Sequence, residues 1–187
     1  MTTTNTQTGT IIMPALSRAA SLGVRLRSVG ETEAAFLEQV YRSTREEELS
    51  RTGWSEAQKA AFIAMQFHAQ DRHYRQHYPA ALWLIVEHHG QPVGRLYLER
   101  WESEHRIIDI ALLPVARGRG LGTALLRDLL DEAAGLQRRV GIHVEKMNPA
   151  MTLYRRLGFR TVADKGVHEL LEWSAAAPGD QVKTDSY

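Results

Sequence analysis

Three glycines at alternate positions join an apolar segment to an amphipathic one, and this junction constrains the fold more than any other feature. Residues 106–113 (RIIDIALL) have the length and apolar content of a buried strand. Residues 120–134 then repeat leucine at helical spacing and end beside a glycine, and residues 140–145 (VGIHVE) predict a second strand. Because strand–helix–strand crossovers are right-handed, we expect these two strands to lie side by side and parallel.

The rest of the chain supplies further strands and helices around this unit. Alternating or continuous apolar runs predict strands at residues 24–29, 81–87, 93–99, 106–113, 140–145, 161–164 and 167–173. Helical spacing and capping residues predict helices at residues 31–49, 55–77, 120–134 and 149–157. The order β-α-α-β-β-β-α-β-α-β-β predicts an α/β fold: a mixed sheet with helices on both faces.

Composition indicates one ordinary globular domain. We expect it at residues 22–174, between polar and flexible tails at 1–21 and 175–187. The formal net charge of +1 argues against nucleic acid or an anionic membrane as a partner. The chain has no cysteine, which excludes disulfides, thiolate zinc sites and a cysteine nucleophile. Without a secretory signal or a membrane-spanning run, a cytoplasmic location is expected.

The glycine-rich loop has the properties of an anion site. Glycine lets backbone N–H groups approach a ligand closely, and the following helix adds unpaired donors and its positive dipole end. Arg117 and Arg119 add positive charge. Neither the dinucleotide pattern G-x-G-x-x-G nor the ATP-type ending G-K-[ST] is present. The alternative is that Gly120 and Gly122 only allow close packing of helix on sheet.

Two motifs carry a family resemblance. Arg117-x-x-Gly120-x-Gly122 directly follows a strand ending in Leu-Leu-Pro. Downstream, the block from Asn148 to Phe159 (NPAMTLYRRLGF) has the form N-x-A-x-x-L-Y-x-[KR]-x-G-F. With both motifs in this order, the sequence resembles the GNAT superfamily of N-acetyltransferases. The resemblance implies acetyl-coenzyme A (acetyl-CoA) as co-substrate and no metal.

The resemblance also implies which residues bind the coenzyme. In that family the strand before the loop diverges from the next parallel strand, and the pantetheine arm lies in the gap. Asn148 would bond this arm, although its place before Pro149 also suits a helix N-cap. The expected coenzyme-binding residues are Leu112, Pro114, Arg117, Gly118, Arg119, Gly120, Leu121, Gly122, Thr123, Asn148 and Tyr154.

The catalytic roles follow from the same resemblance. Tyr154 matches the general acid that protonates the departing thiolate; the alternative is that it only packs beside its leucine neighbours. Asp109, a charged residue inside an apolar strand, is the expected base that acts through water. Glu99, Glu104 and main-chain carbonyls are competitors for that role. Because there is no cysteine, direct transfer in a ternary complex is favoured over an acyl-enzyme.

The acceptor is the least constrained part. The first two helices and their connection would wall its site, with Glu47, Trp54 and Tyr97 as candidate residues and a primary amine of a small molecule or peptide as acceptor. His73 and His77 lie one helical turn apart, but the sequence indicates no third metal ligand. The alternative function is a non-catalytic module that binds or senses acyl-CoA. A homodimer stays open, since dimers are common among similar proteins.

Overall fold

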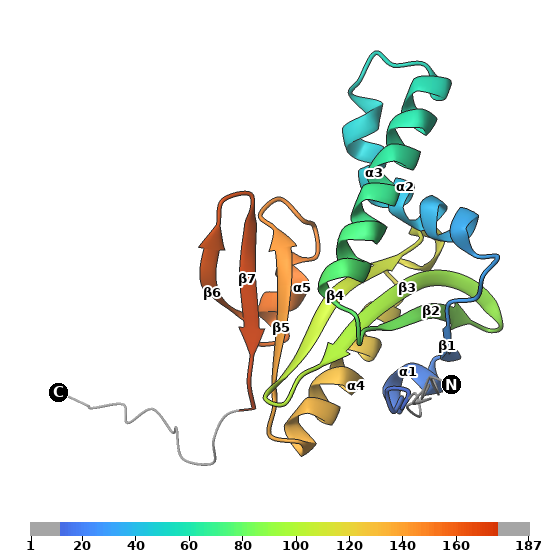
Figure 1. The fold of residues 1–187 in the computed structure, drawn as a ribbon. Coiled ribbons are helices and arrows are strands. Elements are labelled where there is room, and N and C mark those ends of the chain that lie inside the picture. The colour runs from blue at the N-terminus through green and yellow to red at the C-terminus, as the bar shows by residue number, and fades with distance from the viewer. Residues whose placement is uncertain (1–11, 176–187) are drawn as a thin grey trace, which may run out of the picture.

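The computed structural model describes residues 12–175 and contains one seven-stranded sheet with helices on both faces (Figure 1). The strands are β1 (Val24–Ser28), β2 (Leu82–His88), β3 (Gln91–Arg100), β4 (Glu104–Leu112), β5 (Arg139–Glu145), β6 (Arg160–Lys165) and β7 (His168–Trp173). The helices are α1 (Arg18–Ser21), α2 (Ala34–Ser50), α3 (Glu56–His77), α4 (Leu121–Gly135) and α5 (Met151–Arg156), and a single 3-10 turn spans Pro114–Ala116.

The strand order is β1-β2-β3-β4-β5-β7-β6, and β4 and β5 form the parallel pair. Every other neighbouring pair is antiparallel. The expected mixed α/β sheet and its parallel crossover pair are therefore confirmed. Figure 1 shows β1–β4 and β5–β7 as two blades that diverge on one side, with α2 and α3 on one face and α4 on the other.

Local signals set the helix boundaries. Ser55 caps α3 through a reciprocal capping box with Gln58, as its position before acidic and helix-forming residues predicts. Gly120 precedes α4 with a φ of 79°, a left-handed conformation that glycine adopts without strain. The sequence places Gly135 directly after this helix, as a C-cap, but the helix includes that residue, and Gln137 takes the left-handed conformation instead. Within residues 12–175, no helix is long and apolar enough to cross a membrane.

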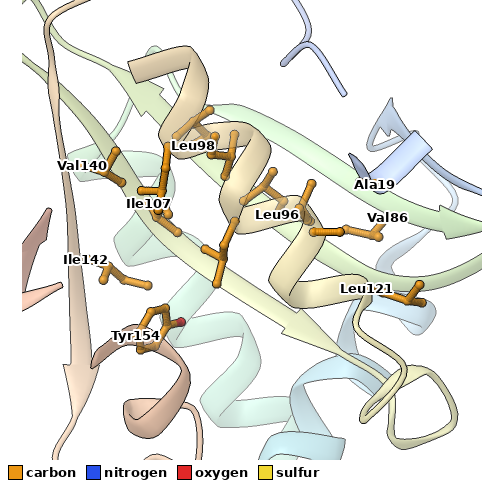
Figure 2. Packing of buried hydrophobic residues seen from close by; sticks show 14 of the residues in the cluster. Ala19, Val86, Leu96, Leu98, Ile107, Leu121, Val140, Ile142 and Tyr154 are labelled. Atoms are coloured by element: carbon orange, nitrogen blue, oxygen red, sulfur yellow. The ribbon is translucent and has the colours of Figure 1, made fainter. Parts of the chain in front are cut away.

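Two apolar cores hold the layers together, one on each face of the sheet. The larger core packs α4 on the central strands, where Leu96, Leu98 and Ile107 meet the helix (Figure 2). The smaller core lies under α2 and α3 and contains Tyr97 and Ile108 of β3 and β4. Burial of these apolar faces is the main source of stability for such a layered fold.

The N-terminal segment is more ordered than its polar composition predicts. Expected to be flexible through Ser21, it instead forms α1, which packs against α4. The buried Asp128 accepts hydrogen bonds from the backbone N–H groups of Ser17, Arg18 and Ala19 at 3.1, 3.0 and 2.8 Å. No local sequence pattern indicates this contact between Asp128 and residues more than a hundred positions earlier. Of the tails expected at residues 1–21 and 175–187, residues 1–11 and 176–187 lie outside the described residues.

A buried polar cluster joins β4 to α4. Glu132 accepts hydrogen bonds from His105 Nε2 at 2.9 Å and from Arg100 Nε at 2.7 Å, and His105 is fully buried. Burial by itself raises the pKa of Glu132, but these hydrogen bonds outweigh it and lower the pKa to about 2. The carboxylate is therefore stabilised in the folded state.

Removal of the Asp128 carboxylate should detach α1. We expect Asp128→Ala to lower the free energy of unfolding by about 2–4 kcal/mol, because three backbone donors lose a charged acceptor. Urea unfolding measures the change. The matched control is Asp131→Ala on the same helix, whose 62% exposed side chain pairs with Arg18 at the surface; a loss as large as that of Asp128→Ala would contradict the assignment.

Acid stability should depend on Glu132. Its folded pKa of about 2 lies below the value of about 4.3 in an unfolded chain. The stabilisation is therefore complete above about pH 4.3 and is lost as pH falls towards 2. In urea titrations at several pH values, Glu132→Gln should be less stable at neutral pH and should lose less stability between pH 4.3 and 2. Parallel wild-type and mutant curves would disprove this.

Candidate active site

The central feature of the site is the point where β4 and β5 separate. Their parallel pairing runs from Glu104↔Arg139 to Ile107↔Ile142 and stops there, although both strands continue. At the same place the β3–β4 register shifts: Leu98 pairs with Ile107, and Tyr97 pairs with Asp109. Ile108 is the extra residue of a β-bulge, which bends β4 and changes the side on which the following side chains lie. The divergence that the resemblance implied is thus present.

A cavity of ≈ 1370 Å³ opens where the strands diverge. Both unpaired strand segments line it, together with parts of α2 and α3, Tyr154 of α5, and Lys165 and His168 of the β6–β7 hairpin. A site of this size exceeds the usual range for drug-sized ligands. The cavity therefore has room for a long, partly polar molecule and a second reactant.

The glycine-rich loop flanks this cavity rather than lining it. Pro114 and Arg117 line the cavity, whereas Leu112 packs on the larger core. Its side chain lies next to Gly94 of β3 and Gly122 of α4. Gly118 and Gly120 have φ values of 71° and 79°. Within residues 12–175 no backbone N–H from 118 to 123 donates to another protein group. That stretch comprises Gly118, Arg119, Gly120, Leu121, Gly122 and Thr123, and its donors can serve an anion.

Arg117 lines the cavity and links the loop to α2. Its Nε donates to the Leu112 carbonyl at 2.7 Å, and its Nη2 donates to the carbonyl and hydroxyl of Ser43 in α2, both at 3.1 Å. Burial lowers the pKa of this guanidinium. In this structure Arg117 ties the loop to α2 through neutral oxygens, while Arg119 is exposed at the loop.

Tyr154 and Asn148 lie on the opposite wall. Tyr154 is 4% exposed and packs edge-on against Phe159; Figure 2 shows its ring beside Ile142. Burial raises the pKa of its phenol well above the usual value, and Asp109 raises it further, so the phenol stays protonated at neutral pH. Asn148 does not cap α5, whose N-cap is Ala150. Its Oδ1 instead accepts the Ala150 N–H at 2.8 Å in the turn before the helix.

Asp109 enters the cavity because of the bulge. Its Oδ2 accepts a hydrogen bond from Arg95, which also donates to Gln70 Oε1 at 3.0 Å and has a side chain 2% exposed. The buried guanidinium therefore has a counter-charge, as burial of a charge requires. Neither of the two carboxylates that compete with Asp109 for the role of base lines the cavity. Glu99 accepts a hydrogen bond from the Ala80 N–H, and Glu104 forms ion pairs with Arg106 and Arg139.

The acceptor residues are only partly brought together. Glu47 lines the cavity, with its 79% exposed side chain paired to Arg51. Trp54 does not: it packs on Phe62 with ring centroids 5.2 Å apart. Tyr97 does not either: the pleat of β3 turns Leu96 and Leu98 to the larger core and the Tyr97 ring to the smaller one, where it is 2% exposed. The expectation that Trp54 and Tyr97 line the acceptor site is therefore wrong.

Sequence reasoning missed His143 in β5. It lines the cavity one residue beyond the last β4–β5 pair, and its Nδ1 lies 3.1 Å from Arg106 Nη1. Alternation along β5 could have indicated it: Ile142 and Val144 both face the larger core, so His143 between them must face the other side of the sheet. As for metal, residues 12–175 contain no group of three or more side chains suited to hold an ion.

Comparisons with known proteins agree with this geometry. Curated relatives are a mycothiol acetyltransferase of Nocardia farcinica, 37% identical over 46% of this chain, and the peptidyl-lysine N-acetyltransferase YjaB of Escherichia coli, 31% identical over 49%. The matches span 28% and 57% of the lengths of those two proteins.

Solved structures share the fold. One is a PaiA N-acetyltransferase of Thermoplasma acidophilum in complex with coenzyme A, with a TM-score of 0.61 and 16% identity over 81% of this chain and 99% of that one. Residues 37–159, which span the diverging strands, the loop and Tyr154, match the family model of the GNAT acetyltransferases. The chain therefore belongs to the acetyltransferase (GNAT) family.

Proposed function

We propose that this protein transfers an acetyl group from acetyl-CoA to a primary amine of a small molecule or peptide, directly in a ternary complex. The observation that carries the proposal is the separation of β4 from β5 after Ile107↔Ile142, beside a loop with unpaired N–H donors. The loop donors from 118 to 123 suit the pyrophosphate. The unpaired backbone of the two strands suits the amide groups of the pantetheine arm, with the side chain of Asn148 nearby.

The reaction needs one proton donor and one acceptor, and the cavity offers both. The amine attacks the thioester carbon, the carbonyl electrons move to oxygen, and the carbon–sulfur bond breaks as the intermediate collapses. Tyr154 gives its proton to the departing thiolate and is reprotonated from solvent. Asp109 accepts the amine proton through water; its Oδ1 makes no hydrogen bond within residues 12–175.

The acceptor remains a class rather than a compound. The two curated relatives are named for mycothiol and for peptidyl lysine, so small-molecule amines and lysine side chains are both sensible candidates. The Glu46–Glu48 run lines the cavity, but arginines pair with each of its carboxylates. Its attraction for a cationic amine is correspondingly reduced. Location in the cytoplasm and a homodimer are part of the same proposal.

Catalysis is tested by thiol release from acetyl-CoA with a panel of small amines and lysine peptides. Since the chain has no cysteine, every thiol detected by a colorimetric reagent comes from coenzyme A. We expect at least one amine to accelerate release, and Tyr154→Phe to lower kcat about 100-fold or more with the Kd for coenzyme A unchanged. Binding of coenzyme A without acceleration by any amine would favour the non-catalytic module.

The loop assignment is tested separately by binding. Gly120 has a φ of 79°, a backbone conformation that residues with a side chain rarely adopt. An added side chain would also stand where the backbone must approach a phosphate. Gly120→Val should weaken coenzyme A binding at least tenfold in calorimetry. Gly53→Val is the matched control, because that glycine lies far along the α2–α3 connection with nothing within 4 Å of its added side chain; wild-type affinity in Gly120→Val would refute the assignment.

A further inference from the structure

Of the imidazoles that line the cavity, His143 is held from behind by the buried Arg106. Arg106 donates from Nη1 towards His143 Nδ1 at 3.1 Å. A guanidinium has donors only, so Nδ1 must be the acceptor nitrogen and the proton of the neutral ring must sit on Nε2. Arg106 therefore selects the tautomer.

Arg106 is itself fixed by its surroundings. Its Nε and Nη2 both lie 2.6 Å from Glu104 Oε1, and its side chain is 8% exposed. The ring of Trp101 stacks on the guanidinium at 4.8 Å. Gly141 leaves the room for this pair, because a Cβ there would lie 2.4 Å from Glu104 Oε1. The buried Glu104 and Arg106 thus hold a single, exposed imidazole at the end of the chain of contacts.

The environment keeps that imidazole neutral. Burial lowers the pKa of His143, and the neighbouring Arg106, His168 and Lys165 lower it further. The strand registers place Glu145, His168 and Lys165 on the same face as His143. Glu104 opposes the shift without reversing it. Glu145 is paired with Arg45 at 2.7 Å. Within residues 12–175, Nε2 makes no hydrogen bond, so its N–H is the group left for a ligand.

We propose that His143 donates a hydrogen bond from Nε2 to the carbonyl oxygen of the acetyl thioester and stabilises the oxyanion that forms there. The inference rests on the proposed function, in which the loop after β4 binds the pyrophosphate and the pantetheine arm lies along the unpaired strands. An arm that runs from the loop along these strands brings its thiol end to the point where β4 and β5 separate. His143 is the first β5 residue beyond that point and lines the same cavity as Tyr154 and Asp109.

The chemistry suits this role. As the amine attacks, negative charge develops on the carbonyl oxygen, and a fixed donor stabilises that charge more than it stabilises the uncharged carbonyl. Arg106 at Nδ1 polarises the ring and strengthens the Nε2 donor. A neutral imidazole does this without adding a positive charge that would repel a cationic amine, and the oxyanion returns its electrons to carbon when the thiolate leaves.

The test compares two ligands that differ by one oxygen. Acetyl-CoA has the carbonyl, and S-ethyl-CoA has a methylene in its place. Calorimetry on the full chain should show that His143→Leu binds acetyl-CoA about three- to tenfold more weakly and binds S-ethyl-CoA as the wild type does. His143→Gln keeps an N–H donor and should restore part of the loss.

The outcomes separate the two proposals. A carbonyl-specific loss in His143→Leu with partial rescue by His143→Gln supports the inference. An equal loss for both ligands, or no loss for either, overturns it and leaves the proposed function standing. If wild-type protein binds neither acetyl-CoA nor S-ethyl-CoA, the proposed function itself fails. Circular dichroism confirms that each variant is folded.

Discussion

The site depends on the failure of β4 and β5 to pair along their full length. Between Glu104 and Ile107 the parallel ladder is intact and anchors the two halves of the sheet to each other. Beyond it, the bulge at Ile108 bends β4 away, and the free edge of each strand faces a cavity. An interior strand normally satisfies its backbone groups within the sheet. Here those groups face the cavity and are left for water or a ligand. The separation of the strands therefore supplies both space and hydrogen-bonding groups.

The bulge also decides which chemistry reaches the cavity. It places Asp109 opposite Tyr97 and on the same face as Arg95, where a carboxylate can balance a buried guanidinium. Without the extra residue, strict alternation would turn Asp109 towards the apolar core under α4. The extra residue Ile108 therefore brings the charged Asp109 to the cavity beside Arg95 and keeps it out of the apolar core.

Two further ion clusters brace this arrangement from outside the cavity. Glu132 holds His105 and Arg100 on the α4 face, at the start of β4. Glu104 holds Arg106 on the other face, and Arg106 reaches His143. Buried charges contribute little net stability unless every partner is in place, but they restrict geometry strongly. Both clusters lie where β4 is still paired, which keeps the diverging ends in defined positions.

The sequence by itself determined the order of elements, the parallel crossover pair, the glycine-rich loop between β4 and α4, and the position of Tyr154. These are local properties: apolar spacing, glycine at a left-handed turn such as Gly120, and motifs read within a dozen residues. Only the tertiary structure decided which side chains share the cavity. The packing of Tyr97 in the core, the retention of α1 by Asp128 and the link from Arg106 to His143 all depend on register, on a bulge or on contacts between distant segments. Such contacts arise from the pairing of strands and helices in space, and no local pattern encodes that pairing.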